Sequence, residues 1–408
     1  MTVASSDPRI EAKRVSIADD AAFGPGVDIE ADEVEIGPGA RIGFSGDDDF
    51  RTLPGVRVRV RRLVVGAGAT IGRSVRIDGG DIVLGEGVRI LRNSTVKVLD
   101  ELRIGAYGTV NEACEIGGRQ ITIGQELWML PTAKIGGGSA YELTSSLEIG
   151  HYVHLGVQTL INTARPVTIG HEVGLGTRTS IYTHGAYPSR LQGFPVAFDG
   201  VEIGDFTWIP GATINPGVKI GRNVVVGVNS LVTSSLPDGC LAVGSPAKVV
   251  KENAYPRPFG AEQRTRFFDE FLARYAVLLG SGGAVESGGP DGASRLDDGS
   301  TILVGVAADD GASVMTGLAG AEGLDRRRVV AIGPGVAGAT VPETWTLIDP
   351  STRRIRGTAD AASERFVNEL RRYGIRFYSR PRGDRYVDWD VEPPSFGAAP
   401  TTERTSER

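Results

Sequence analysis

The sequence predicts a mainly β protein, a parallel β-helix of hexapeptide repeats followed by a helix and a small C-terminal α/β domain. Two observations lead to this fold class. Aliphatic residues recur at every sixth position along much of the chain between Ile36 and Val232. Glycine is abundant, at 57 of 408 residues, whereas aromatic residues make up only 7%. Such a composition is typical of a fold that turns often and packs small β-branched side chains.

The six-residue period is clearest in the middle of the chain. Its best examples are Ile149, Leu155 and Ile161, then Ile169, Leu175 and Ile181, and then Ile203 and Ile209. This period fits neither a helix nor simple strand alternation. It fits a triangular coil, in which three hexads make one turn with aliphatic side chains inside and small residues at the corners. One coil cannot bury its apolar side alone, so coils must stack around a continuous core.

Two segments interrupt the period. Residues 43–55 break it early, and residues 184–200 (HGAYPSRLQGFPVAFDG) break it between two of the most regular coils. Both are predicted to be loops that leave the scaffold. Loops held by a rigid scaffold often carry function, so the second loop marks a candidate site.

The sequence divides into five regions. The β-helix is predicted over residues 1–255, and an amphipathic helix within 256–280 is expected to cover the open end of the coil stack. Residues 281–300 are rich in Gly, Ser and Asp and predict a flexible linker. A small α/β domain of unknown role is expected over 301–390, and a disordered tail over 391–408.

The α/β domain has a basic segment. Between Ser351 and Asp388 the sequence holds ten arginines and five acidic residues. A solvated basic face is the simpler interpretation, and a docking surface for an anionic partner is the alternative.

Composition also limits the function. The net charge of −6 argues against nucleic acid as the main partner. No apolar stretch approaches the ~18 residues of a membrane span, and the first residues lack the apolar core of a secretory signal. Cys114 and Cys240 lie far apart, so neither a disulfide framework nor a thiolate zinc site is indicated. A cytoplasmic protein is expected.

A dense motif follows the second loop. It runs from the histidine through VEIGDFTWIPGATINPGVKIGRN to GSPAK. Residues 181–251 resemble the C-terminal half of the maltose/galactoside O-acetyltransferase-like group of hexapeptide-repeat acyltransferases. The resemblance implies a left-handed β-helix and a homotrimer with its active site between neighbouring copies. It also implies transfer of an acyl group from acyl-coenzyme A to a hydroxyl or amino group of a sugar-like or other small acceptor. Acetyl is the acyl group expected. No metal is expected.

His184 is the candidate general base, because imidazole has a suitable pKa and the family places a histidine near this loop. Maltose-type members carry theirs two places later. His151 and His171 each follow an inward isoleucine by two places and are expected on the outer surface, whereas His154 is a weaker candidate that faces a groove.

The remaining site residues follow from the motif. Those expected to bind the coenzyme are Trp208, Gly211, Ala212, Gly227, Val228, Asn229, Ser230, Pro246, Ala247 and Lys248. Lys248 suits the coenzyme phosphates or is simply a solvated charge. Gln158, Tyr187 and Arg190 are expected to contact the acceptor.

Two alternatives remain open at this point. The β-helix is a catalytically inactive scaffold or assembly protein in one of them. In the other it is a zinc-dependent enzyme like the carbonic anhydrases of this fold, which need three histidines from two chains. His151 and His154 suggest a pair, but no third histidine has the required spacing.

Overall fold

The computed structural model describes residues 8–44, 54–280, 285–286, 293–297, 301–320 and 328–396. The chain forms two compact units, residues 1–256 with 396–408, and residues 257–395. Most of the predicted early loop, residues 281–284, 287–292 and 298–300 of the predicted linker, and the tail beyond residue 396 lie outside the described residues.

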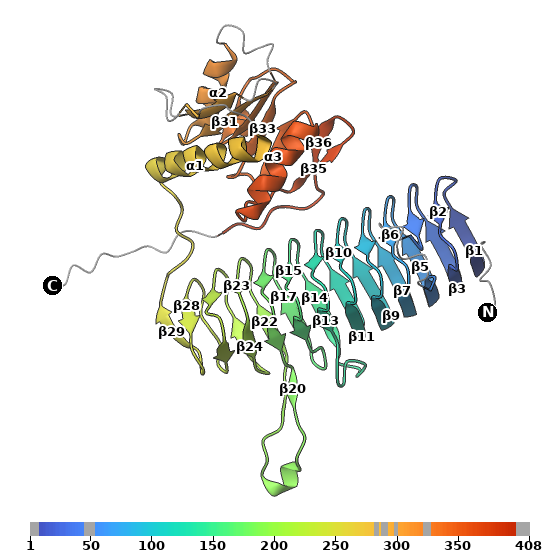
Figure 1. Ribbon diagram of the computed structural model, residues 1–408. Coiled ribbons are helices and arrows are strands. Elements are labelled where there is room, and N and C mark those ends of the chain that lie inside the picture. The colour runs from blue at the N-terminus through green and yellow to red at the C-terminus, as the bar shows by residue number, and fades with distance from the viewer. Residues whose placement is uncertain are drawn as a thin grey trace, which may run out of the picture. The chain divides into compact units, whose positions relative to one another are not determined.

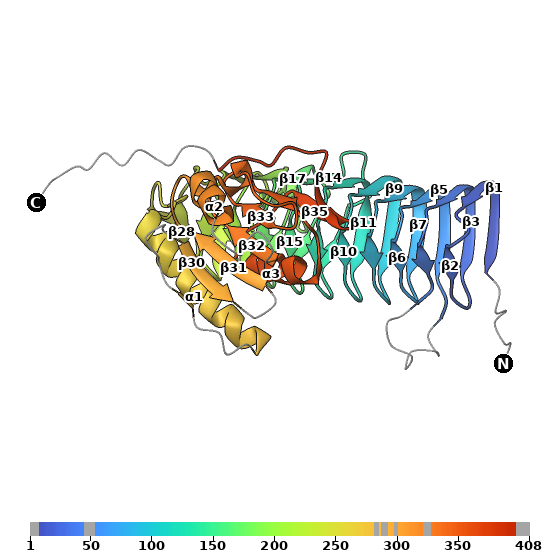
Figure 2. The same cartoon turned by 90° about the horizontal axis from the view of Figure 1, so that it is seen from above.

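The first unit is the predicted parallel β-helix (Figure 1). In its N-terminal half, each coil contributes one long strand that covers two faces of the prism. These strands pair in parallel, and Figure 2 shows them side by side. They are β1 (Arg9–Ile17), β3 (Asp28–Ile36), β5 (Arg57–Val65), β7 (Arg76–Leu84), β9 (Thr95–Ile104) and β11 (Glu115–Ile123).

In the C-terminal half, each long strand is replaced by two short ones. Strand β11 pairs with both β13 and β14, so the two series continue its two ends. One series is β13 (Lys134–Ile135), β16 (Leu160–Ile161), β19 (Ser180–Ile181), β24 (Ala212–Ile214) and β27 (Ser230–Val232). The other is β14 (Ser146–Ile149), β17 (Val167–Ile169), β22 (Val201–Ile203) and β25 (Lys219–Ile220).

The third face is a sheet of short strands that runs the whole length of the β-helix. It begins with β2 (Ala22–Phe23), β4 (Arg41–Ile42), β6 (Thr70–Ile71), β8 (Arg89–Ile90), β10 (Thr109–Val110) and β12 (Trp128–Met129). It continues with β15 (His154–Leu155), β18 (Gly174–Leu175), β23 (Trp208–Ile209), β26 (Val225–Val226), β28 (Leu241–Val243) and the antiparallel β29 (Lys248–Lys251).

The hexad residues form the core, as predicted. Ile42, Ile71 and Ile90 are fully buried, and so are their counterparts in later coils. Glycines stack at the corners because the coils approach too closely for a side chain. A Cβ on Gly150 would lie 2.7 Å from the carbonyl carbon of Gly170 in the next coil.

The second unit is a layered α/β structure. Its sheet has the order β30 (Ala293–Asp297), β31 (Thr301–Val306), β32 (Arg328–Ile332), β33 (Thr346–Asp349) and β34 (Arg354–Gly357). Strands β31 to β33 are parallel and the outer two antiparallel. Three helices, a 3-10 turn and a hairpin complete the unit: α1 (Ala261–Leu279), α2 (Gly311–Ala319), η3 (Val336–Gly338), α3 (Ala361–Arg372), and β35 (Ser379–Arg382) with β36 (Arg385–Asp388).

The predicted amphipathic helix exists as α1, but its expected partner is wrong. Its buried face packs within the second unit, where the ring centroids of Phe271 and of Phe366 in α3 are 5.3 Å apart. An apolar stripe predicts that a helix is covered and does not identify what covers it. Residues 293–297, which the sequence assigns to the linker, form strand β30.

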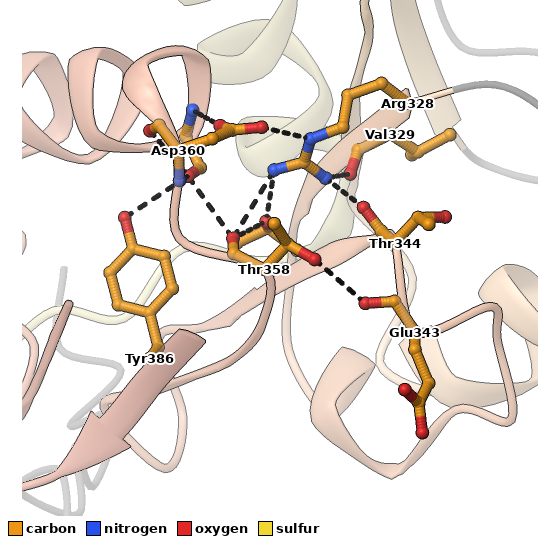
Figure 3. Close-up of polar contacts among 9 residues, drawn as sticks. Arg328, Val329, Glu343, Thr344, Thr358, Asp360 and Tyr386 are labelled. Carbon is orange, nitrogen blue, oxygen red and sulfur yellow. Dashed lines mark hydrogen bonds and ion pairs between the residues drawn. The ribbon is translucent and has the colours of Figure 1, made fainter. Parts of the chain in front are cut away.

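The basic segment of this unit is largely used internally. Arg354 and Arg356, for example, donate to backbone carbonyls of the same unit. Arg328, just outside the segment, is a fuller case (Figure 3): its guanidinium donates to Asp360, to Thr346 and to the carbonyls of Val329 and Thr344. The pKa of Asp360 is lowered to about 2, because the hydrogen bonds from Arg328 and Ser363 outweigh the opposing effect of burial. Because these arginines bind groups of their own unit, a structural role for the basic segment is favoured over a docking surface.

Candidate functional site

His184 lies where the second interruption leaves the β-helix. The coil ends after β19, and the chain continues as β20 (His184–Gly185), which pairs antiparallel with β21 (Ala197–Phe198). Between them the loop projects away from the coils and carries the 3-10 turn η2 (Arg190–Gln192) (Figure 1). The rigid coil therefore fixes the position of His184, and the loop begins beside it.

The His184 ring is held by Asn162 from the preceding coil. Nδ1 of His184 lies 2.9 Å from Oδ1 of Asn162, which is only 4% exposed. The same oxygen accepts hydrogen bonds from the Thr183 hydroxyl at 2.6 Å and from the Ala164 N–H at 3.2 Å. The Asn162 Nδ2 donates to the Gly138 carbonyl at 3.0 Å. These contacts fix which way the amide points.

This arrangement sets the tautomer of His184. Because the Asn162 oxygen is an acceptor, Nδ1 must carry the proton, and Nε2 then keeps its lone pair. The phenyl ring of Phe198 stacks on the imidazole with centroids 5.7 Å apart. A Cβ on Gly138 would lie 3.5 Å from Nε2, so the glycine leaves open space next to that nitrogen. The geometry suits a base that takes a proton through Nε2.

A cationic group lies near this corner. Arg165 donates to the Glu142 carboxylate at 2.7 Å and lies over the Phe198 ring at 4.8 Å. The hydrogen bond from Arg165 lowers the pKa of Glu142, which therefore stays ionised at neutral pH. Both residues belong to corner segments that neighbour the His184 loop.

A groove of about 610 Å³ lies at a different corner of the coils. Five of the residues expected to bind coenzyme line it: Gly211, Ala212, Val228, Asn229 and Ser230. Arg178, Ser245, Thr177 and Thr213 add further polar side chains to its lining. The structure thus brings half of the predicted coenzyme residues into one groove.

The GSPAK segment borders this groove. The Ser230 hydroxyl accepts a hydrogen bond from the Gly244 N–H, and Leu231 exchanges backbone hydrogen bonds with Gly244 and Ala247. Pro246 lies in this turn, and Lys248 follows it, exposed on β29. Gly227 is packed against Val243, since a Cβ there would lie 2.8 Å from the valine side chain. Ser230 and Gly227 thus also hold the turn in place.

The predicted acceptor residues do not gather around His184 within one copy. Gln158 lies at the groove corner, where its Oε1 accepts from Arg178 at 3.2 Å. Tyr187, fully exposed, and Arg190 lie in the projecting loop. Trp208, which was expected to bind the coenzyme, does not line the groove; it is outward and 44% exposed on β23, with its ring over Gly174.

His184 and the groove are separated by one face of the prism. The groove corner precedes strands such as β19 and β24, and the His184 corner follows them. Strand residues advance about 3.3 Å each, so the two corners lie roughly 15 Å apart. One copy alone therefore does not place the histidine against the groove.

His151 and His171 are not simple surface residues, which corrects the expectation. Nδ1 of His151 accepts from the Gln125 N–H at 2.9 Å, and Nδ1 of His171 accepts from the His151 N–H at 3.0 Å. The Asp205 carboxylate continues the series by accepting from the His171 N–H. Burial, together with the neighbouring His171, lowers the pKa of His151 to about 4. These side chains join successive coils.

Three further expectations concern metals, thiols and membranes. Within the described residues, no group of three His, Cys, Asp or Glu side chains is placed to hold a metal ion. Cys114 and Cys240 are free and buried, and burial raises the pKa of Cys114 to about 11. Of the helices in the described part of the chain, none is both long and apolar enough to span a membrane.

Asn162 and Gly138 were not predicted from the sequence. The sequence does contain a signal for Asn162. It directly follows the inward Ile161 of β16, as Tyr182 follows Ile181 of β19, so it opens the same corner one coil before the loop. Reading polar residues down a corner, rather than along the chain, would have found it.

Comparison with known proteins finds acetyltransferases among the relatives of this chain. No protein-family model matches the chain. A putative acetyltransferase of Saccharomyces cerevisiae is 36% identical over 113 residues, which are 26% of this chain and 57% of that protein. The galactoside O-acetyltransferase of Escherichia coli is 30% identical over 135 residues, which are 32% of this chain and 63% of that protein. The chain thus spans about six tenths of the length of these relatives.

Among solved structures, a hexapeptide-repeat acetyltransferase of Vibrio cholerae complexed with acetyl-coenzyme A is 26% identical. The match covers 34% of this chain and 69% of that one, with a TM-score of 0.26. The β-helix of this chain is thus similar to known acetyltransferases, and these relatives support the hexapeptide-repeat acyltransferase family that the motif predicts.

Proposed function

We propose that the protein transfers an acyl group, acetyl in the first instance, from acyl-coenzyme A to a hydroxyl or amino group of a sugar-like acceptor. The observation that carries this proposal is the His184–Asn162 pair, which leaves Nε2 as a free base beside the open space at Gly138. The relatives named acetyltransferases support the reaction class, and the galactoside enzyme supports a sugar-like acceptor.

In the proposed reaction, Nε2 of His184 removes the proton from the acceptor as its oxygen or nitrogen attacks the thioester carbonyl. The carbonyl oxygen becomes an oxyanion, and the carbon–sulfur bond then breaks. The imidazolium returns its proton to the departing coenzyme thiolate, so the histidine ends as it began. Asn162 holds the ring, and its carbonyl oxygen stabilises the Nδ1–H of the imidazolium.

The coenzyme is proposed to lie in the groove lined by Gly211, Val228 and Asn229, with Lys248 near its phosphates. Since His184 and this groove lie at different corners of one copy, a neighbouring copy is proposed to bring them together. A homotrimer built from the faces of the prism does this, and its projecting loop carries Tyr187 and Arg190 towards the neighbour. Light scattering should give a trimer mass, and a monomer at micromolar concentration would contradict the shared site.

The reaction is tested with purified protein, acetyl-coenzyme A and a panel of mono- and oligosaccharides, measuring release of free thiol. Acceptor-dependent release that is lost in His184→Ala is the expected result. Calorimetry with coenzyme A separates this proposal from the inactive scaffold, which would not bind it. A chain ending at residue 256 should still bind, because the groove lies within the first unit and α1 belongs to the second.

A further inference from the structure

The sheet of short strands presents a single file of outward side chains. In each strand from β4 to β23 the second of two residues points into the core, so the first points away from it; among these first residues Thr109 is also buried, at 8% exposed. Strand pairing places these residues in direct register from coil to coil. We call them the outer row: Arg41, Thr70, Arg89, Thr109, Trp128, His154, Gly174 and Trp208.

One end of the outer row is aromatic. Trp128 is 56% exposed and meets His154 edge to face, with ring centroids 5.5 Å apart. Trp208 is 44% exposed, and its ring fills the space above Gly174, where a Cβ would lie 2.4 Å from its Cε3. At about 4.8 Å per coil, these four positions give a continuous aromatic surface roughly 14 Å long.

The other end of the outer row is cationic. Arg89 donates to the Thr109 hydroxyl, and Arg41 lies 4.7 Å from the centre of the Phe44 ring. Neither arginine forms an ion pair with any residue that the structure describes. The row itself contains no acidic residue, although the chain carries a net charge of −6. Carboxylates flank the row at both corners: Glu86 accepts a hydrogen bond from the Tyr107 hydroxyl, and Glu112 pairs with Arg92.

The dimensions favour a chain-like ligand over a protein partner. With roughly 250 Å² of surface for each tryptophan, the exposed parts of Trp128 and Trp208 amount to about 250 Å². A stable protein interface needs about 800 Å² from each partner. A row one side chain wide instead matches a single extended polymer. Sugar rings stack on aromatic faces, and acidic groups on a sugar pair with guanidinium groups.

We propose that the outer row binds a linear glycan carrying acidic groups. Its sugar rings stack on Trp128 and Trp208, and its acidic groups pair with Arg89 and Arg41. The proposal extends the proposed function by making the acceptor a polymer, but the binding itself requires no acyl transfer.

Intrinsic fluorescence of the full chain tests the proposal directly. Of the four tryptophans, Trp345 and Trp389 are only 1% and 5% exposed, so an aqueous quencher reaches mainly Trp128 and Trp208. Iodide should quench part of the emission of the unliganded protein, and less of it when the glycan is bound. If iodide quenches nothing in the free protein, the face is covered by another copy and the proposal fails.

The probes are a galacturonate hexasaccharide, its monosaccharide and the neutral maltohexaose. The acidic hexasaccharide should change the emission saturably, and the other two should bind at least tenfold more weakly. Trp128→Ala should weaken binding at least tenfold and Arg89→Ala about fivefold, whereas Leu143→Ala, which removes an exposed side chain outside the row, should have no effect. Thermal unfolding should confirm that each variant folds. Equal binding of the neutral chain with a silent Arg89→Ala overturns the acidic ligand, and no binding of any probe overturns the site.

His184→Ala keeps the two proposals apart. It should bind the acidic hexasaccharide as the unaltered protein does. Hexasaccharide binding without any acyl transfer would contradict the proposed function alone. Acyl transfer to small sugars without hexasaccharide binding would contradict the glycan proposal alone.

Discussion

The two halves of the β-helix share one hexad repeat but differ in structure at one corner of the prism. In the N-terminal half, strands such as β7 and β9 run through this corner without a break and pair with their neighbours on both sides of it. In the C-terminal half the chain leaves the sheet here, at residues 136–145, 162–166 and 182–200. His184 and Asn162 lie in these segments. The same scaffold therefore carries candidate chemistry only where the corner is not closed by strand pairing.

Charge follows the same division. The closed corner carries a ladder of ion pairs between coils, including Arg14 with Glu33 and Arg61 with Asp81. The open corner has the Arg165–Glu142 ion pair, and its other polar groups form hydrogen bonds around the imidazole. The N-terminal half is thus expected to set stability and the C-terminal half activity. The predictions for His184, Asn162 and Arg59 test that division.

The largest effect is expected for His184→Ala. Loss of a general base should lower kcat by ~10²–10⁴, while coenzyme affinity changes little because the groove lies at another corner. Steady-state kinetics with a small acceptor and calorimetry with coenzyme A measure the two quantities. His154→Ala is the matched control, since His154 lies on the sheet of short strands. If His154→Ala loses activity and His184→Ala keeps it, the base has been assigned to the wrong histidine.

A smaller loss is expected for Asn162→Ala, which removes the acceptor that fixes the His184 ring. We expect roughly a tenfold to hundredfold lower kcat, because the base remains but is poorly oriented. Asn162→Asp supplies a readout that a purely structural role would not give. A carboxylate beside Nδ1 stabilises the imidazolium. In the pH profile of kcat, the acid limb, where the base becomes protonated, should therefore move to higher pH. An unchanged profile would indicate that Asn162 only supports the corner.

These two residues show what the sequence could and could not predict. The coils follow from the hexads because an inward aliphatic side chain every six residues has one geometric solution, and His184 follows from the motif beside the loop. Asn162 was missed because it lies 22 residues earlier, and only stacking of the coils brings it next to His184. The partner of α1 was wrong because amphipathicity does not specify which surface is covered. The separation of His184 from the groove could not be predicted either, because it depends on the order of the faces around the prism.

Protonation of His151 at low pH is expected to lower the stability of the fold, and this effect should be of intermediate size. Its folded-state pKa of about 4 lies below the ordinary value of 6.5, so the unfolded chain binds a proton more readily. The stability that depends on neutral His151 is therefore full above about pH 6.5 and is lost as the pH falls towards 4. Melting curves of the chain ending at residue 256 should show this loss. His151→Asn should reduce it, because an amide oxygen can accept the Gln125 N–H without titrating. A melting temperature with the same pH dependence in both proteins would show that other groups dominate.

The smallest effect is expected in the closed half, for Arg59→Gln. Arg59 pairs with Asp28 on the neighbouring strand, and both side chains remain about a quarter to a third exposed, at 29% and 27%. Removing such a pair should cost about 0.5–1 kcal/mol at low salt and less at high salt. The hydrogen bond from Arg59 lowers the pKa of Asp28, so this stability is present above the ordinary carboxyl pKa and disappears as acid protonates the group. Denaturant unfolding at neutral pH and at pH 3 should therefore show a difference that vanishes in acid, with acyl transfer unchanged. If Arg59→Gln instead lowers kcat, the N-terminal coils contribute to the site and the division between the two halves is wrong.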